Sequence, residues 1–408
     1  QAPELQVKKL QKLFEKLRND VIEPLVIRRT RTDIENNDDY LKDIKNQGIE
    51  FPKIDNPEKL DYKLDERLTK LFFDTVEMIT GIDEDGDEVE GLGYYRYRAI
   101  EFLKYEKDRK IYGNVTSISK RLSAIMKTLL VKRLESSFFA FKQSLKRLNI
   151  AIDNMIEMFD NNRVFIAPDL DINKLLEEGK TYEDIEAKIA SKEGNNKEFT
   201  SDLFKNEFYD KLKDDKKTIN KLVNRWNDII EDPKLDVFEK HIHNTFFDRQ
   251  RNPSGKLVIF TESKETANEL EKRIQKKSKH DILKVSAENR HQLEPIIRDN
   301  FDANLEQDRW KDDYNIIITT EVLAEGINLH RSNTIVNYDV PWNATKLMQR
   351  IGRVNRIGSR DKKVYVYNYY PSAHGDQQIR LVNNALRKLQ AFHTAFGEDN
   401  KIFSLLEQ

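Results

Sequence analysis

Arginines dominate one short stretch late in the chain, Gln349-Arg-Ile-Gly-Arg-Val-Asn-Arg-Ile-Gly358. Seven lysines or arginines and a single acid lie from Lys346 to Lys363, although the charges of the whole protein balance. Arg353 and Arg356 are three residues apart, so on a helical turn both guanidinium groups leave the same face. A guanidinium is permanently charged and forked, which suits the oxygens of a phosphoryl group in transfer. On the pattern alone, a phosphate-binding pair and a solvated basic surface both remain open.

Two other stretches look like phosphate or metal motifs but lack the residues that the chemistry needs. Gly179-Lys-Thr181 has the end of a phosphate-binding P-loop, but Lys174 stands where the loop requires its first glycine. Asp83-Glu-Asp85 lies in a hydrophilic turn, so we do not expect it to hold magnesium. The sequence contains no cysteine, which excludes thiolate metal sites. We therefore expect no metal site in this chain.

The composition sets broader limits. The 408 residues exceed one typical domain, and 70 Lys plus Arg against 71 Asp plus Glu mean that any nucleic-acid surface must be local. No apolar run reaches the length of a membrane span. Because the chain has no cysteine, disulfides give no reason to expect an oxidising compartment. We expect a cytoplasmic protein without a membrane partner. Because the chain starts at Gln1, inside a helical pattern, we also expect a fragment of a longer protein.

Short apolar runs alternate with helical patterns from residue 251 to residue 375. This alternation predicts a parallel sheet with ligands at the carboxyl ends of its strands. Thr261 and Thr320 end two of the strands, where a hydroxyl could hold a backbone phosphate without reading bases. A strand-end cap is the alternative for each threonine. The predicted strands are 256–261, 281–285, 315–319, 334–338 and 363–369, and the predicted helices between them are 264–276, 290–301 and 343–351.

Residues 62–250 have a helical and strongly charged pattern. Apolar residues recur at steps of three to five from Ile118 to Ile156, so one helix of ~60 Å could carry this stripe at about 1.5 Å per residue. We predict that the stripe is buried in a helical bundle, and a coiled coil that binds a protein partner is the alternative. A further helix is expected over 376–408.

The arginine stretch resembles motif six of superfamily-two helicases, where two arginines contact the γ-phosphate of ATP. Residues 319–329 resemble motif five, with the Gly-Ile-Asn-Leu ending typical of the Swi/Snf branch. Tyr338-Asp-Val-Pro-Trp-Asn343 is similar to the bacterial HepA-like group of that branch. Residues 256–263 stand in the place of motif four, and residues 25–34 resemble the segment that closes the first RecA-like lobe. The motifs follow the order of the family.

The resemblance implies an architecture. Residues 251–375 would form a RecA-like second helicase lobe, an α/β domain with a parallel sheet and flanking helices. A large all-helical region, 62–250, would precede it, as a protrusion or insertion longer than the family's usual one. Residues 1–61 would be the end of the first RecA-like lobe and a linker.

The resemblance also implies roles for single residues. Arg353 and Arg356 would be the catalytic arginine fingers, Gln349 would line the nucleotide cleft, and Gly326 with Asn328 would shape the loop between nucleotide and nucleic acid. ATP and Mg²⁺ would be bound mainly by the first lobe, which carries the P-loop. This chain alone should therefore hydrolyse no ATP.

We accordingly interpret the chain as the C-terminal half of an ATP-dependent DNA translocase or helicase that contacts the DNA backbone without sequence preference. The alternative from another class is a non-catalytic module that binds nucleic acid or a protein partner on a helicase-like scaffold. A finger pair argues against a pure scaffold. An RNA helicase is disfavoured by the Gly-Ile-Asn-Leu and Pro-Trp-Asn sequences.

Overall fold

The computed structural model describes residues 37–46, 52–83, 87–110, 115–166, 197–320, 323, 326–341, 344–356 and 358–372. The predicted helix over 376–408, the segment resembling the end of the first lobe at 25–34, and Gly179-Lys-Thr181 lie outside these residues. The chain divides into two compact units, residues 1–51 and 52–408. The described part of the first unit is helix α3 (Asp38–Asn46), which begins where the Asn37 side chain accepts hydrogen bonds from the amides of Asp39 and Tyr40.

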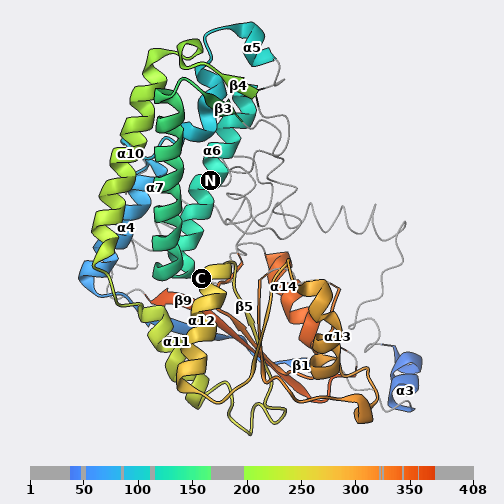
Figure 1. Ribbon diagram of the computed structural model, residues 1–408. Coiled ribbons are helices and arrows are strands. Elements are labelled where there is room, and N and C mark those ends of the chain that lie inside the picture. Colours follow the sequence, from blue (N-terminus) through green and yellow to red (C-terminus); the bar gives the residue numbers. More distant parts are fainter. Residues whose placement is uncertain are drawn as a thin grey trace, which may run out of the picture. The chain divides into compact units, whose positions relative to one another are not determined.

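A parallel sheet forms the centre of the second unit (Figure 1). Among the described residues it has seven strands, in the order β1-β9-β8-β5-β7-β6, and β2 also pairs with β9. All of these pairings are parallel. The strands are β1 (Lys53–Ile54), β2 (Glu58–Lys63), β5 (Leu257–Phe260), β6 (Ile282–Val285), β7 (Ile316–Thr319), β8 (Thr334–Asn337) and β9 (Lys363–Ser372).

Helices cover both faces of this sheet, which explains why its central strands are apolar on both sides. Side chains of β5 alternate between two cores, with Leu257 and Ile259 in one and Val258 and Phe260 in the other. Helices α11 (Pro233–Asn244) and α12 (Lys264–Lys277) close the first core. Helices α13 (Arg290–Phe301) and α14 (Ala344–Val354) close the second. The short turn η4 (Gln307–Arg309) follows α13.

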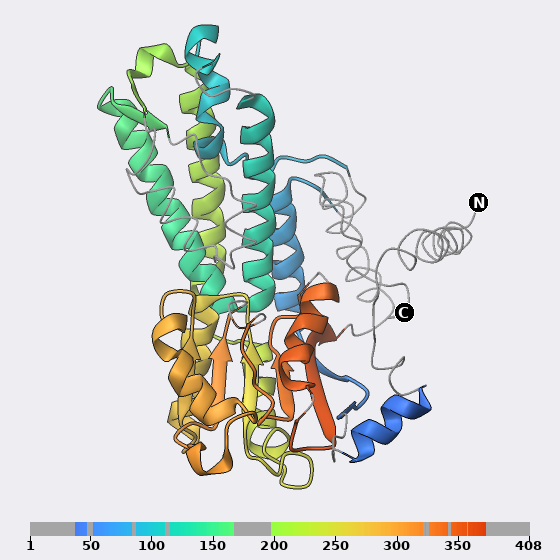
Figure 2. The ribbon, with the colours of Figure 1, turned by 90° about the vertical axis from the view of Figure 1, so that its right-hand side faces the viewer.

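A bundle of long helices adjoins the sheet at its carboxyl edge (Figures 1 and 2). Leu134, Phe141, Leu148 and Trp226 are among the side chains buried in its core. The bundle consists of α4 (Glu66–Thr80), η2 (Tyr95–Phe102), α6 (Val115–Ser136), α7 (Phe138–Asp160) and α10 (Asn206–Asn227). At its far end lie α5 (Glu106–Lys110), η3 (Ser201–Leu203) and the antiparallel pair β3 (Val164–Ile166) and β4 (Lys197–Phe199).

The apolar stripe of the helical region is carried by two helices, so the expectation of one continuous helix was wrong. The chain turns back at Ser137, which has an extended backbone (φ −160°, ψ 135°) and caps α7 by accepting a hydrogen bond from the amide of Ala140. Turning back at this point lets α6 and α7 bury their apolar faces against each other, which a single helix could not do. The described part of the stripe is buried in the bundle, as predicted.

The predicted fold class is confirmed: an α/β lobe with a parallel sheet and flanking helices, with a large helical region before it. β1 and β2 come from the segment assigned from sequence to the first lobe and its linker, and α11 comes from the region assigned to the helical bundle. In the structure all three elements belong to the sheet and its covering. None of the described helices is both long and apolar enough to cross a membrane.

Candidate functional site

Helix α14 carries most of the arginine-rich stretch, and Arg350 fixes this helix to the sheet. The Arg350 side chain is fully buried. Its Nη1 atom donates to the Asn337 side chain at 3.1 Å and to the backbone carbonyl of Asp339 at 2.7 Å, and its guanidinium lies 5.1 Å from the centre of the Phe260 ring. Arg350 therefore acts within its own lobe.

Arg353 and Arg356, the predicted fingers, are half-buried at the end of α14. Arg353 Nε donates to the carbonyl of Gln349 at 3.4 Å, and Arg356 Nε donates to the carbonyl of Gly352 at 3.1 Å. Both side chains thus run back along α14, which carries Arg353 and ends two residues before Arg356. The contact to Gln349 is made by its backbone carbonyl, one helical turn before Arg353.

The loop after β7 is joined to the arginines by two contacts. The Asn328 side chain accepts a hydrogen bond from Arg356 Nη1, and the amide of Leu329 donates to the carbonyl of Arg353 at 2.9 Å. Asn328 is itself held, because its Nδ2 atom donates to Asp302 at 3.2 Å. The geometry therefore makes Asn328 a residue that orients Arg356.

Gly326, three residues before Leu329, has a backbone that requires glycine. Its φ is +82°, and a Cβ atom there would lie 2.7 Å from Nη2 of Arg290. The left-handed conformation lets the loop pass close to the start of α13. Gly326 thus shapes the loop that leads to Asn328 and Leu329.

Thr261 and Thr320 lie on neighbouring strand ends, but their hydroxyl groups differ in environment. They follow β5 and β7, which are paired so that Phe260 lies beside Thr319. The Thr261 side chain is fully buried and donates to Asp339 at 2.5 Å. The Thr320 hydroxyl is buried without a hydrogen-bond partner among the described residues. The geometry favours the capping alternative for Thr261.

Asp339 is the residue that the sequence analysis missed. One carboxylate oxygen accepts from Lys234 at 2.9 Å. The other accepts from the Ser136 hydroxyl at 2.7 Å, from Thr261, and from the amide of Glu262 at 2.9 Å. Asp339 therefore joins the helical bundle, α11, the end of β5 and, through its carbonyl, α14. We call this set, Ser136, Lys234, Thr261 and Asp339, the buried junction.

Charge and hydrogen bonds favour the ionised form of the Asp339 carboxyl group. Burial by itself would raise the pKa of Asp339, but the Lys234 ammonium and the donors around the carboxylate outweigh it and hold the pKa below its usual value. The ammonium of Lys234 also donates to the carbonyls of Glu135 and Ser136 at 3.0 and 3.2 Å. Asp339 stands in the Tyr-Asp-Val-Pro stretch that carried the family resemblance, which was the available signal for it.

Comparison with known families agrees with this arrangement. Residues 233–358 match the family described as the helicase conserved C-terminal domain. These residues are thus similar to the C-terminal domains of helicases. The matched segment, which we call the helicase C-terminal domain after that family, includes α11, three residues of the buried junction (Lys234, Thr261 and Asp339) and the arginine stretch.

Individual relatives match about a quarter of the chain. The uncharacterized ATP-dependent helicase YqhH of Bacillus subtilis is 33% identical over 101 residues, which are 25% of this chain and 18% of that protein. The ATP-dependent RNA helicase dbp-5 of Neurospora crassa is 30% identical over 112 residues, 26% of this chain and 21% of that protein. The chain thus spans about a fifth of the length of these curated relatives.

Among solved structures, the Hef helicase domain of Pyrococcus furiosus is similar with a TM-score of 0.39 and 16% identity. That match covers 85% of this chain and 65% of the other. A likeness of this size adds nothing to the assignment of the domain, which depends on the match over residues 233–358.

Proposed function

We propose that this chain is the C-terminal part of an ATP-driven DNA translocase of the Swi/Snf type, close to the bacterial HepA-like group. The observation that carries the proposal is the contact between the two parts of the site. Arg356, at the end of α14, is held by Asn328 of the loop after β7. A residue that senses phosphate and a loop at the nucleic-acid edge of the sheet are thereby physically connected.

Arg353 and Arg356 are better suited to binding a triphosphate than to a purely structural role. Among the described residues, Nη2 of Arg356 has no hydrogen-bond partner, so this group can still receive a phosphate oxygen. Guanidinium groups stabilise the charge that spreads over the phosphoryl oxygens during transfer. Gln349 would line the same cleft. ATP supplies the free energy, and the remaining triphosphate and Mg²⁺ contacts are assigned to the first RecA-like lobe, because this sequence contains no P-loop.

DNA is the proposed substrate, with contacts to the backbone and without sequence preference. The Gly-Ile-Asn-Leu and Pro-Trp-Asn sequences support DNA, whereas the names of several relatives describe them as RNA helicases. Thr320 remains the proposed phosphate contact because its hydroxyl is unpaired among the described residues. Thr261 keeps only an indirect part, since its hydroxyl is bonded to Asp339.

Around residues 233–358, which match the helicase family, we propose the following domain division. Residues 1–51 would lead from the first lobe, the helices between β2 and α11 would form the helical protrusion, β1, β2 and residues 233–375 the second lobe, and 376–408 a terminal helix. The helical protrusion remains a possible site for a protein partner, as the alternative to DNA.

The arginine pair gives the test of this proposal. In the longer protein that contains the first lobe, Arg353→Ala or Arg356→Ala should lower the ATP turnover rate by about 10³, since finger arginines act on transition-state charge. Arg356→Lys should restore little, because an ammonium cannot make a forked contact. Met348→Ala is the matched control, because Met348 lies on α14 and is 61% exposed. Turnover near wild type in both alanine variants would favour the non-catalytic scaffold instead.

A further inference from the structure

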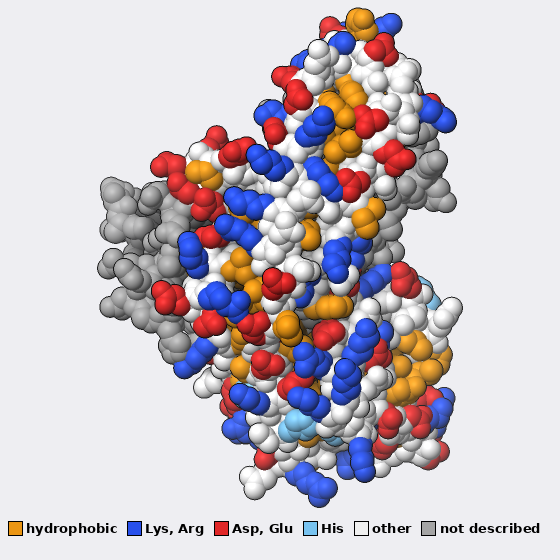
Figure 3. Space-filling view, turned by 60° about the vertical axis from the view of Figure 1, so that its left-hand side comes forward, with side chains coloured by type: hydrophobic (Ala, Val, Ile, Leu, Met, Phe, Trp, Pro, Cys, Tyr) orange, Lys and Arg blue, Asp and Glu red, His pale blue; other side chains and the backbone are white. Residues whose placement is uncertain are grey.

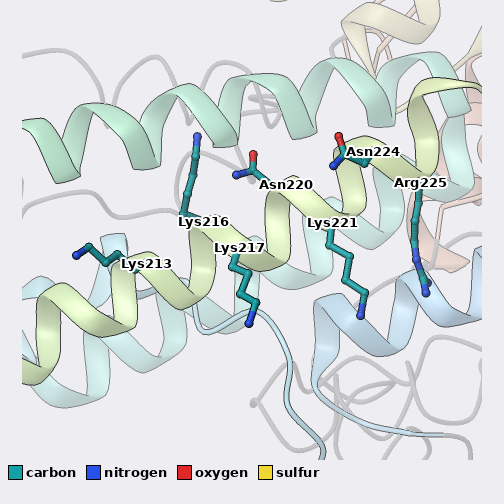
Figure 4. Close-up of a pocket in the computed structure, with 7 residues that line it drawn as sticks. All are labelled: Lys213, Lys216, Lys217, Asn220, Lys221, Asn224 and Arg225. Carbon is teal, nitrogen blue, oxygen red and sulfur yellow. The ribbon is translucent and has the colours of Figure 1, made fainter.

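A groove on α10 is lined only by basic and amide side chains (Figure 4). Lys216, Asn220 and Asn224 point toward one side of the helix, and Lys217, Lys221 and Arg225 toward the other (Figure 4). The lining residues are Lys213, Lys216, Lys217, Asn220, Lys221, Asn224 and Arg225. The groove belongs to the helical bundle and contains none of the residues of the helicase C-terminal domain.

The charges of α10 are separated along its length. Its acids, Glu207, Asp210, Asp214 and Asp215, all stand in the first half, and residues 216–227 contain four lysines or arginines and no acid. Lysine and arginine side chains are mixed with acidic ones over the face that Figure 3 shows. The second half of α10 is thus a local basic surface on a molecule of balanced charge.

Some cations of this surface are held by neighbouring helices and others are not. Lys216 pairs with Asp153 of α7, and Arg225 pairs with Asp74 of α4 at 3.2 Å. Lys217 and Lys221 are exposed, and within the part of the chain that the structure describes neither has a carboxylate or hydrogen-bond partner. An exposed ammonium without a partner is available to an external anion at little desolvation cost.

The spacing suits a repeating anion. Lys213, Lys217, Lys221 and Arg225 follow one another at four-residue steps, which places their Cα atoms about 6 Å apart along the helix. The row therefore extends over roughly 18 Å. A single small anion would use only one or two of these groups, whereas a polyanion can contact the whole row.

The chemistry of the lining favours nucleic acid over an acidic protein. The lining contains no apolar or aromatic side chain. Protein interfaces need an apolar centre, enriched in aromatic residues. Phosphate backbones are bound by lysines, arginines and amide donors such as Asn220 and Asn224. α10 and α14 lie on opposite sides of the second unit (Figures 1 and 2), so a polyanion on α10 leaves the finger arginines uncovered.

We propose that the row formed by Lys213, Lys217, Lys221 and Arg225 on α10 is a second nucleic-acid contact. It binds the phosphate backbone beside the helicase C-terminal domain. The choice of nucleic acid, as opposed to another polyanion, depends on the proposed function. The grip is non-specific and depends on salt, because point charges on flexible side chains carry no base readout.

Binding of labelled duplex DNA to the whole chain, measured by fluorescence anisotropy over a salt series, tests the proposal. Lys217→Gln with Lys221→Gln should weaken binding roughly tenfold at low salt and reduce the slope of log K against log salt by about 2, since each lost contact removes about 0.9. The matched control is Lys272→Gln with Lys276→Gln, because these lysines are also exposed and four residues apart, on α12. The control should change both quantities by less than half as much.

Two outcomes would overturn the proposal. One is equal DNA binding by the α10 variant and the wild-type chain. The other is a loss of binding to poly-glutamate in the α10 variant while binding to DNA is unchanged, which would assign the surface to an acidic protein. Failure here is separable from failure of the proposed function, because the finger arginines are tested by ATP turnover and these lysines by binding alone.

Discussion

Gly326 lies where the loop after β7 meets the start of α13. Its φ of +82° is costly for any residue with a Cβ atom, and the added carbon would push against the Arg290 guanidinium. Gly326→Ala should reduce the free energy of unfolding by about 1–2 kcal/mol, measured by urea denaturation. Most of this cost comes from backbone strain at a positive φ. The contact with Arg290 contributes less, because the Arg290 side chain can move.

Gly352 provides the control for that substitution. It lies inside α14, and a Cβ atom there would meet nothing within 4 Å. Gly352→Ala should therefore leave stability unchanged or raise it by up to about 1 kcal/mol, the usual gain in a helix interior. Equal destabilisation by both substitutions would show that the loop conformation is not the cause.

Asp215 makes the stability of the helical bundle depend on pH, because its carboxyl has a raised pKa. Burial raises the pKa of this carboxyl to about 6, against the opposing hydrogen bonds from the amides of Gly93 at 2.6 Å and Tyr95 at 2.7 Å. Because the folded-state pKa is raised, the contribution of Asp215 to stability is complete below its unfolded value near 4 and is lost as pH rises through about 6.

The unfolding free energy of the wild-type chain relative to Asp215→Asn should therefore fall between pH 4 and pH 6, by up to about 3 kcal/mol. Urea unfolding of both proteins across this range measures the difference. A difference that stays flat, or that rises with pH, would mean that Asp215 remains ionised in the folded protein.

Single residues with chemical meaning could be predicted where the chemistry depends on spacing along the chain. The three-residue step from Arg353 to Arg356 was visible in the sequence, and so was the glycine at 326. Asp339 was not, because its partners Ser136, Lys234 and Thr261 are far from it in sequence and meet only after the bundle folds against the sheet. The contact of the Thr261 hydroxyl with Asp339 could not be predicted for the same reason.

At the scale of elements, α6 and α7 show how an apolar stripe becomes a bundle. Phe141 is fully buried and packs edge-on against Trp226, with ring centres 5.2 Å apart. Trp226 is anchored in turn, since its Nε1 atom donates to Thr75 of α4 at 2.8 Å. The stripe thus ties α4, α7 and α10 together.

A charge placed in this contact should be strongly destabilising. Phe141→Asp or Leu134→Asp should lower the unfolding free energy by several kcal/mol, on the order of the cost of an unpaired buried charge. Ile150→Asp is the control, because Ile150 lies on α7 with its side chain 59% exposed. Thermal melting curves compare the three variants. Melting temperatures equal to wild type for Phe141→Asp and Leu134→Asp would contradict the burial of the stripe.

The sequence predicted the elements better than their junctions. The apolar runs of β5, β7 and β8 identify buried strands by their composition. The turn at Ser137 could not be predicted from the sequence. The apolar period continues across it, and only the capping residue distinguishes two helices from one. The pairing of β2 with β9 was also missed, since contacts between distant strands leave no local pattern.

At the scale of the whole second unit, buried hydrogen bonds connect the helical bundle to the sheet and its covering helices. Asp232 accepts hydrogen bonds from Leu235 at the start of α11 and from Phe138 at the start of α7. Together with the buried junction, this carboxylate fixes the helical bundle to the helicase C-terminal domain. Through Asp339 and Arg350 these contacts also link the bundle to α14, the helix that carries Arg353.

The central proposal is that this domain supplies the finger arginines of an ATPase that takes its P-loop from a first RecA-like lobe. The most direct measurement is the rate of ATP hydrolysis by this chain alone and by the longer protein with its first lobe, each with and without duplex DNA. We expect no turnover from the chain alone and turnover stimulated by DNA in the longer protein, because the arginines supply charge but cannot hold Mg-ATP by themselves. Robust hydrolysis by the chain alone, or a longer protein that hydrolyses no ATP with DNA present, would contradict the account.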